Sequence, residues 1–408
     1  HAKKENLITM CTPFDEKSVD TIVKHEIDII KVASCSALDW PLLQKISQVN
    51  KPVIISTGGK TFPEMDKIFN FFTHKNMQFA MLHCVGMYPV QEEYAQLNCI
   101  KRMKRRYNGI DIGYSGHEDP NDFSICKMSV AMGASIYERH VGLKTDNISL
   151  NAYSTDVNDL GYWVEAILSA KRICGGIEKQ ISEQELQSMR ELARGCYAKV
   201  EIRKGEAISR EKVFFAMPCQ PDQTTSGEFI DETIATKEYK RNEAINEAEK
   251  QSLIKKTRSI IHEVKGMLYE ANIIVGNNFS LELSHHYGIE KFREVGVTII
   301  NIVNREYCKK YIIVLPGQKH PVHYHKKKEE SFQVLYGELD ITLDGNEYSL
   351  YPGEIVTIER LVKHSFSSAK GCIFEEISTT HIVDDSYYDD EYISKLDVME
   401  RKTILENW

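Results

Sequence analysis

Six short runs of apolar, mostly β-branched residues recur along the first part of the chain. They lie at Leu7–Thr12, Ile27–Ser34, Pro52–Thr57, Gln78–Cys84, Gly109–Ser115 and Ser135–His140. Nearly continuous apolar runs separated by helical stretches are typical of parallel strands that are buried on both faces. A closed TIM (β/α)8 barrel needs eight such strand–helix units. We therefore expect a partial barrel over residues 1–178 that lacks its first two units, with an open, doubly wound sheet as the alternative.

The pattern changes twice in the rest of the chain, so the fold class is α/β plus β. Short alternating strands around a Lys-Gly-Glu turn predict a small β-rich module over residues 179–236. Residues 237–270 are rich in Lys and Glu, which predicts a charged helical linker. Residues 271–408 predict a small β barrel. Its expected strands are Tyr311–Leu315, Phe332–Tyr336, Leu339–Leu343, Glu347–Leu350, Ile355–Ile358 and Ile373–Ile377.

Polar and titratable residues collect where the six parallel runs end, at Thr12, Lys31, Ser34, Ser56, His83, Tyr88, Ser115, His117, Glu138 and His140. The carboxyl ends of parallel strands build the active sites of barrels and open sheets alike. Lysine and hydroxyl donors at one mouth suit a phosphate or a carboxylate. His117 and His140 follow adjacent strands, and they form either a two-imidazole metal site or two ordinary satisfied polar side chains.

The strand-end motifs also match a known family in order and spacing over residues 1–175. They are Cys-Thr-Pro-Phe-Asp at 11–15, Ile-Lys-Val-Ala-Ser at 30–34, Ile-Ser-Thr-Gly-Gly at 55–59, Leu-His-Cys at 82–84, Tyr-Pro at 88–89, Ile-Gly-Tyr-Ser-Gly-His at 112–117 and Tyr-Glu-Arg-His at 137–140. This series resembles the N-acetylneuraminate (sialic acid) synthases. The resemblance implies a barrel that condenses phosphoenolpyruvate with the aldehyde of an N-acyl sugar, giving a nonulosonic acid and phosphate.

The resemblance also implies roles for individual residues of this sequence. The residues expected to bind the phosphate and carboxylate of phosphoenolpyruvate are Thr12, Lys31, Ser34, Ser56 and Ser115. His117 and His140 would hold a divalent metal, Mn²⁺ or Mg²⁺, and Tyr88 and Asn151 would line the sugar site. The candidate catalytic residues are Lys31, His117, His140 and Glu138.

Several positions depart from the family pattern, mainly around the expected sugar. Gly116, Gly86 and Asn151 stand where the family has Asp, Asn and Asp. The module over 179–236 resembles the antifreeze-like (SAF) module that caps the partner's active site in a domain-swapped homodimer of that family. Met217 stands where an Arg of that module reaches the sugar. We therefore expect an acceptor other than N-acetylmannosamine.

A second group of metal-ligand residues lies in the C-terminal barrel. His323 and His325 are two positions apart on an expected strand and therefore share a face. With Glu330 and His364 they form a set of three nitrogens and one oxygen, which suits Mn²⁺, Fe²⁺, Ni²⁺ or Zn²⁺. The region resembles a cupin, and its flanking motifs resemble the D-lyxose isomerase-type branch of sugar cupins.

Three functions are compatible with the cupin. It is a binding or assembly domain, a metal-dependent sugar isomerase or epimerase in which a carboxylate or lysine moves a proton, or a sensor of the synthase product. Lys326, Lys327 and Lys328 are expected in a solvated turn. The leading prediction for the whole chain is synthesis of a sialic-acid-like nonulosonic acid. The alternatives are an enzyme centred on the cupin and a non-catalytic sugar-binding protein.

Charge and cysteine usage narrow the range of partners. The 408 residues carry 51 Lys and Arg against 59 Asp and Glu, a net charge of −8, and the basic cluster at 101–106 predicts a solvated helix face. Nucleic acid is therefore not expected as a partner. No window approaches the roughly 18 apolar residues of a membrane span, and there is no signal-peptide pattern. Ten cysteines without CxxC pairs predict reduced thiols in a cytoplasmic protein.

Overall fold

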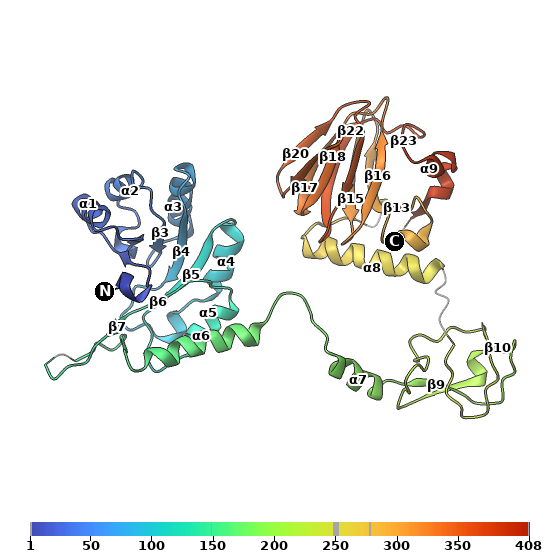
Figure 1. Cartoon of the computed structure of the whole chain (residues 1–408), viewed down its shortest axis with the longest axis horizontal. Coiled ribbons are helices and arrows are strands. Elements are labelled where there is room, and N and C mark those ends of the chain that lie inside the picture. The colour runs from blue at the N-terminus through green and yellow to red at the C-terminus, as the bar shows by residue number, and fades with distance from the viewer. Residues whose placement is uncertain (1, 148, 248–252, 277–278, 407) are drawn as a thin grey trace. The chain divides into compact units, whose positions relative to one another are not determined.

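The computed structural model describes residues 2–147, 149–247, 253–276, 279–406 and 408. The chain forms two compact units, residues 1–181 and 182–408 (Figure 1). Each unit has its own hydrophobic core. Among the helices in these described ranges, none combines the length and the apolar character that crossing a bilayer requires.

The first unit is built on a six-stranded parallel sheet whose strands follow one another in chain order. They are β1 (Met10–Cys11), β2 (Ile29–Val32), β3 (Val53–Ser56), β4 (Phe79–Cys84), β5 (Asp111–Gly116) and β6 (Tyr137–Arg139). Every neighbouring pair is parallel. A doubly wound sheet reverses its strand order at a switch point, whereas a barrel adds each strand beside the previous one. The strand order therefore confirms the barrel-type sheet.

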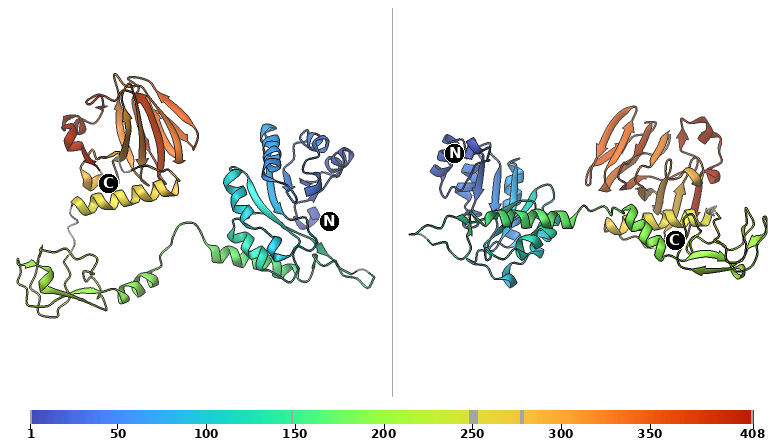
Figure 2. Two further views of the ribbon diagram at one scale, coloured as in Figure 1. Left: turned by 180° about the vertical axis from the view of Figure 1, so that it is seen from behind. Right: turned by 60° about the horizontal axis from the view of Figure 1, so that its bottom comes forward.

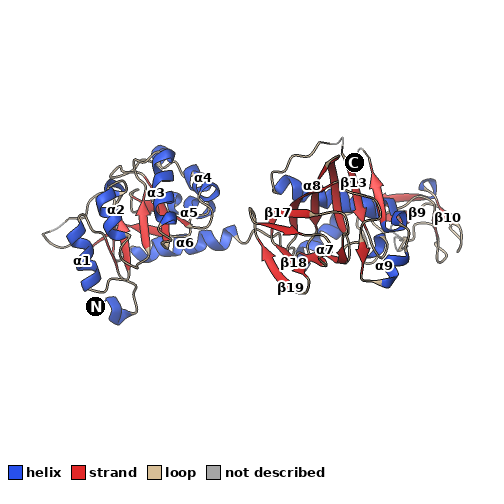
Figure 3. Cartoon of the chain, turned by 90° about the horizontal axis from the view of Figure 1, so that it is seen from above, coloured by secondary structure: helices blue, strands red, loops and turns tan. Residues whose placement is uncertain are grey.

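Helices alternate with these strands. They are α1 (Glu16–Lys24), α2 (Trp40–Ile46), α3 (Phe62–His74), α4 (Asn98–Arg106), α5 (Ser124–Ala131) and α6 (Leu160–Cys174) (Figure 3). Asp15 and Asp39 cap α1 and α2 by accepting backbone N–H groups, and Thr61 and Glu64 form a reciprocal capping box on α3. The short strands β7 (Val141–Gly142) and β8 (Thr155–Asp156) pair in parallel after β6.

The alternation of side chains along each strand separates an apolar face from a polar face. Ile30 and Val32 of β2 pack with the helices, so Lys31 between them points to the opposite face. The Lys31 Nζ lies 2.7 Å from Ser56 Oγ on β3 and 3.3 Å from Glu138 Oε2 on β6. In a flat sheet β2 and β6 would be roughly 19 Å apart, at about 4.8 Å per strand. The sheet is therefore strongly curved, with polar side chains on its concave face.

The second unit begins with α7 (Glu183–Leu192) and a small β-rich module. In the module β9 (Gly195–Ala198) pairs with β11 (Val213–Ala216), and β10 (Ala207–Ile208) pairs with β12 (Thr233–Ile234), both antiparallel. The buried side chains of Tyr239 and Ile245 complete its core. The module therefore continues to residue 247, beyond the expected boundary at 236.

The charged helical linker expected over 237–270 is corrected by the structure. Residues 248–252 lie outside the described residues. α8 (Leu253–Glu270) is helical, but Ile260, Val264 and Leu268 form an apolar stripe that packs against the C-terminal β strands. Figure 1 and Figure 2 view the chain from different sides, and α8 lies against the barrel in each view. A few apolar residues at helical spacing decide this packing, although residues 237–270 as a whole are rich in Lys and Glu.

Two antiparallel sheets face each other across an apolar core and form the C-terminal barrel. The seven-stranded sheet has the order β20 (Ile355–Ile358), β17 (Glu330–Gly337), β22 (Cys372–Thr379), β15 (Tyr307–Val314), β14 (Val297–Asn304), β13 (Ser280–Ser284) and β24 (Lys402–Leu405). The five-stranded sheet has the order β19 (Asn346–Leu350), β18 (Leu339–Leu343), β21 (His364–Ser367), β16 (Lys319–Tyr324) and β23 (Tyr387–Tyr388). A short helix, α9 (Glu391–Lys395), follows β23.

The all-β prediction for this region is confirmed, but the apolar pattern did not predict every strand. It missed β21, which begins with an inward-facing histidine, and it indicated β16 only through the spacing of His323 and His325. The buried His320 and His323 lie on β16, and His364 begins β21. Their burial is the first sign of a polar site inside this barrel.

Candidate functional site

A buried lysine is the centre of the polar cluster on the concave face of the first unit. The Lys31 Nζ donates a hydrogen bond to Ser56 Oγ and forms an ion pair with Glu138. The Ser56 hydroxyl also lies 3.4 Å from Glu138 Oε2. The structure thus brings together three of the predicted residues, from β2, β3 and β6. Its lysine and hydroxyl donors suit an anionic ligand.

The other predicted phosphate-site residues lie at the ends of neighbouring strands. Ser34 Oγ accepts a hydrogen bond from the Gly58 N–H at 2.9 Å, and a Cβ at Gly58 would lie 2.8 Å from that oxygen. Burial raises the pKa of the Cys84 thiol, which also interacts with Ser34 and Ser115. Thr12 is half-buried directly after β1. These residues place hydroxyl groups on the strand ends beside the Lys31 cluster.

Two imidazoles and two phenol rings form a second cluster at the ends of β4, β5 and β6. The ring centres of His117 and His140 are 5.2 Å apart, and Tyr88 lies 4.2 Å from His117. Tyr153 lies 5.1 Å from His140 and 5.3 Å from Tyr88. Sequence reasoning missed Tyr153 as a site residue, although it stands two residues after the candidate Asn151. Asn151 is exposed, and its Oδ1 accepts a hydrogen bond from the Tyr153 N–H.

His117 has the protonation state that metal binding requires. His117 Nδ1 donates to the Val85 carbonyl oxygen at 3.1 Å, so its Nε2 keeps a free lone pair. Burial lowers the pKa of His117, and the nearby carboxylate of Glu138 opposes this shift. The imidazole is therefore neutral at pH 7. This donor set fits a divalent cation with open positions for a substrate.

A buried ion pair supports the segment that carries His117 and His140. Arg139 Nη1 lies 2.7 Å from Glu118 Oε1, and the Tyr114 hydroxyl donates to Glu118 Oε2 at 2.9 Å. A Cβ at Gly116 would lie only 2.3 Å from that same Oε2. The Glu118 carboxylate therefore occupies the space that an aspartate at position 116 would need. The departure at Gly116 is thus coupled to the Glu118–Arg139 pair.

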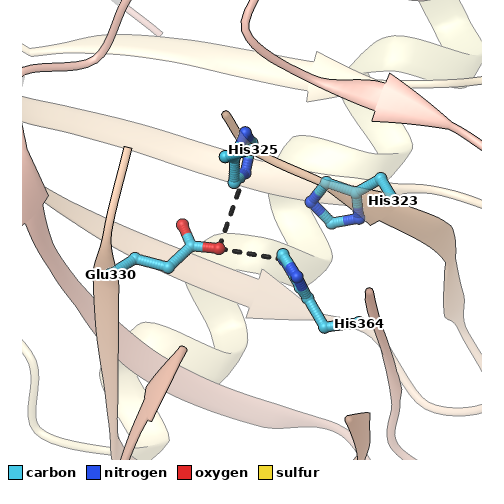
Figure 4. Close-up of side chains that lie close together, drawn as sticks. All are labelled: His323, His325, Glu330 and His364. Atoms are coloured by element: carbon cyan, nitrogen blue, oxygen red, sulfur yellow. Dashed lines mark ion pairs between the residues drawn. The ribbon is translucent and has the colours of Figure 1, made fainter. Parts of the chain in front are cut away.

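Four buried residues inside the C-terminal barrel form a candidate metal centre. One nitrogen or oxygen atom from each of His323, His325, Glu330 and His364 lies within 4.8 Å of the others. They come from β16, the residue after it, β17 and β21, and their side chains converge in Figure 4. The Glu330 Oε1 lies 2.9 Å from His364 Nε2 and 3.5 Å from His325 Nε2.

The hydrogen bonds of the three histidines leave their Nε2 atoms free. Each Nδ1 donates to a backbone carbonyl oxygen, of Pro321, Asp385 and Val362 respectively. The buried Nε2 atoms of His325 and His364 and the Oε1 of Glu330 have no hydrogen-bond partner among the described residues. Burial lowers the pKa of His325 to about 4. Unpaired lone pairs that point at one another fit a metal ion, which the sequence pattern predicted.

Two buried lysines accompany this centre and correct one expectation. Lys328 is only 5% exposed and pairs with both Glu330 and Glu376, so it does not belong to a solvated turn. Lys310 Nζ lies 3.3 Å from the same Glu376 Oε1. Backbone N–H groups of residues 326–328 donate to the Asp385 carboxylate, which turns Lys328 inward while Lys326 and Lys327 stay exposed. The alternation of inward and outward positions along β15 and β22 could have identified Lys310 and Glu376 as inward-facing residues.

Comparison with known proteins assigns both regions to families. The NeuB family matches residues 1–179, and a cupin domain matches residues 310–373. The N,N'-diacetyllegionaminic acid synthase of Campylobacter jejuni is 30% identical over 60% of this chain and 74% of its own length. The N-acetylneuraminate-9-phosphate synthase of Mus musculus is 29% identical over 51% of this chain and 58% of its own length.

A solved structure shows the same similarity. A Chromobacterium violaceum protein assigned to spore coat polysaccharide biosynthesis is 38% identical, with a TM-score of 0.57 over 60% of this chain and 73% of its own. The chain spans 58% to 74% of the length of the two synthases described above.

Proposed function

This chain belongs to the NeuB family, and we propose that its first unit condenses phosphoenolpyruvate with the aldehyde of an N-acyl sugar. The products are a sialic-acid-like nonulosonic acid and phosphate. The observation that carries the proposal is the placement of two clusters at the strand ends of one parallel sheet. One is Lys31, Ser56 and Glu138, and the other is His117, His140 and the Tyr88 and Tyr153 rings.

The Lys31 cluster has the chemistry needed to bind phosphoenolpyruvate. Lys31 and the hydroxyls of Ser34, Ser56 and Ser115 supply donors for its phosphate and carboxylate, and Thr12 adds a further hydroxyl. Negative charge grows on the departing phosphate, and fixed cationic donors in a buried site stabilise that charge. Glu138 orients the Lys31 ammonium through the 3.3 Å ion pair.

The histidine cluster has the chemistry needed to bind the acceptor sugar. His117 and His140 would hold Mn²⁺ or Mg²⁺, which when bound polarises a carbonyl oxygen as a Lewis acid. The hydrogen bond from His117 Nδ1 to Val85 fixes the ring that presents Nε2. Tyr88 and Tyr153 form the walls beside both imidazoles, and Asn151 positions Tyr153. Holding both reactants at one sheet edge adds the advantage of proximity.

The same residues argue for an acceptor other than N-acetylmannosamine. Gly116 offers no side chain to the sugar, and the carboxylate of Glu118 occupies the space that a side chain at this position would need. Met217 is 63% exposed in the small module and carries no charge. We propose that this module caps a partner's site in a domain-swapped homodimer, with Met217 near the sugar. The acceptor would then differ from N-acetylmannosamine at the groups that face positions 116 and 217, where the family has Asp and Arg.

The C-terminal barrel adds a metal-binding function to the proposal. His323, His325, Glu330 and His364 would hold Mn²⁺, Fe²⁺, Ni²⁺ or Zn²⁺. The support is their set of buried, unpaired ligand atoms.

Phosphate release tests the condensation. The protein, with any further segment its gene encodes, is loaded with Mn²⁺ and assayed with phosphoenolpyruvate and a panel of N-acyl hexosamines. We expect release that depends on one sugar. In His117→Ala the rate of release should fall at least about 100-fold, because this variant lacks a metal ligand; each tenfold corresponds to about 1.36 kcal/mol of activation free energy. His74→Ala, an exposed histidine at the end of α3, is the matched control.

Two results would contradict this proposal. One is the absence of release with every sugar from folded, metal-loaded protein. The other is conversion of a sugar without phosphoenolpyruvate that survives in His117→Ala, which would assign the main chemistry to the cupin.

A further inference from the structure

A cavity adjoins the metal centre of the C-terminal barrel, and His323, His325 and Glu330 form part of its wall. Its volume is about 120 Å³, measured as the space open to the centre of a water-sized sphere. One water needs roughly 10–15 Å³ of such space, so the cavity has room for roughly ten waters. It can therefore take the core of one monosaccharide in reach of the metal ligands, with larger substituents extending into its open mouth.

Cations outnumber carboxylates among the buried and half-buried residues of this wall. The cations are Lys310, Lys328, Arg401 and Lys402, and the carboxylates are Glu282, Glu330 and Glu376. A further carboxylate, that of Asp384, lies at the exposed mouth. A divalent metal held by Glu330 and the histidines would raise the positive excess of the wall by two charges.

The ion pairs show which cations remain uncompensated. Lys402 and Glu282 pair with each other at 3.4 Å. Lys310 and Lys328 share one oxygen of Glu376, at 3.3 Å and 3.0 Å. Lys328 also contacts Glu330, but a bound metal would compete with Lys328 for the charge of that carboxylate. Two buried ammonium groups therefore depend on essentially one carboxylate.

Arg401 is the clearest uncompensated charge. Within the described residues, neither an Asp nor a Glu forms an ion pair with its guanidinium, which lies 5.1 Å from the Tyr388 ring centre. Its Nε is buried without a hydrogen-bond partner. The neighbouring His286 is neutral at pH 7, since burial and then Arg401 itself lower the pKa of its imidazole to about 3, so it offers Arg401 no counter-charge. Arg401 is half-buried, and burying part of a charged group without a counter-charge is costly unless a ligand completes the pair.

We propose that this cavity binds an anionic sugar, a polyhydroxylated molecule that carries a carboxylate or a phosphate. Arg401, Lys310 and Lys328 recognise the anion, and the hydroxyl groups face the metal centre. A neutral sugar would leave Arg401 without a counter-charge and would leave Lys310 and Lys328 sharing the Glu376 carboxylate. The inference rests in part on the proposed function, since the product of the first unit is itself a carboxylated sugar. The cupin would then bind that product or a phosphorylated relative of the acceptor.

Calorimetric titration of the whole, metal-loaded chain tests this inference. The probes are N-acetylneuraminate as the carboxylated sugar, N-acetylmannosamine 6-phosphate as the phosphorylated sugar, and N-acetylmannosamine as the neutral one. We expect one anionic probe to bind at least tenfold more tightly than the neutral probe. Arg401→Gln should weaken that binding at least tenfold, and Arg401→Lys should restore part of it. Arg360→Gln, an exposed arginine on the same barrel, is the control.

A variant of the first unit separates the two binding sites. Lys31→Met removes the proposed phosphoenolpyruvate site, so binding at the cupin should persist in this variant while phosphate release is lost. Binding that disappears in Lys31→Met but survives in Arg401→Gln would overturn the inference and leave the proposed function intact. Failure of phosphate release in the unmodified chain, with anion binding retained, would overturn the proposed function alone.

Salt dependence gives a test without any substitution. Binding through charge weakens as ionic strength rises. A salt-independent affinity, equal affinity for the neutral probe, or no binding of any probe to folded protein would each contradict the anionic-sugar proposal.

Discussion

Shared counter-charges dominate the chemistry of the second unit at the scale of single residues. Glu376 is the common partner of Lys310 and Lys328, and all three side chains are buried. Burial alone would raise the pKa of Glu376, but the two ammonium groups outweigh it and lower the pKa to about 2. One carboxylate therefore holds two cations beside the candidate metal centre.

Glu376→Gln should destabilise the second unit by about 3–5 kcal/mol at pH 7, because it leaves two buried lysines without their counter-charge. Urea unfolding followed by circular dichroism would measure the change. Glu347→Gln, an exposed carboxylate on β19, should change stability by less than about 0.5 kcal/mol.

The pH dependence of the same pair has a defined sign. Because the folded-state pKa of Glu376 is depressed, its contribution is fully present above the unfolded value of about 4.3 and is lost as the pH falls toward 2. Acid should therefore destabilise Glu376→Gln less than the unmodified chain, by the part that protonation of this carboxylate causes. An unchanged acid slope in the variant would contradict this assignment.

Short amphipathic elements decide the packing at the scale of helices and strands. α8 is rich in lysine, yet Ile260, Val264 and Leu268 place one apolar stripe on the seven-stranded sheet. Along β15 the alternation sends Ile313 toward α8, while Ile312 and Val314 face the barrel core. The same alternation turns Lys310 inward, which explains how an apolar strand delivers a cation to the cavity.

Leu268→Ala should destabilise the second unit by about 2–5 kcal/mol, because it opens a cavity between α8 and the sheet. Tyr269→Ala on the exposed side of the same helix is the matched control. Thermal unfolding monitored by circular dichroism would compare them. Equal effects of the two substitutions would show that α8 is not packed on the barrel through this stripe.

Two units with separate cores, each carrying its own candidate metal site, make up the whole chain. A ligand that binds only the folded state stabilises it in proportion to the logarithm of its concentration relative to Kd. The candidate metal centre of the cupin has four ligand residues, whereas the proposed site of the first unit has two imidazoles. Metal loss should therefore affect the second unit more.

Chelation should lower the unfolding temperature of the second unit by several degrees, since roughly 1 kcal/mol corresponds to about 2–4 °C in a unit of this size. Differential scanning calorimetry before and after EDTA would measure it, with metal content determined by mass spectrometry. His325→Ala should abolish this shift, and His117→Ala should preserve it. A shift that survives in His325→Ala would place the stabilising metal elsewhere.

Local patterns in the sequence were sufficient for the strands of the first unit, the strand-end motifs and the four candidate ligand residues of the cupin. Strand signals and ligand spacings lie within a few residues of each other, so they do not depend on the folded chain. Lys31 with Ser56 and His323 with His325 were therefore predicted and are found together.

The tertiary structure alone decided the remaining features, because burial and charge compensation depend on residues far apart in the chain. The sequence predicts Lys328 in a solvated turn, whereas the structure pairs it with Glu376 from another strand. Tyr153 joined the histidines only through the fold around them. The positive excess that Arg401 adds to the cupin cavity arises where distant strands enclose one space, and no local pattern reports which charges such a space leaves unpaired.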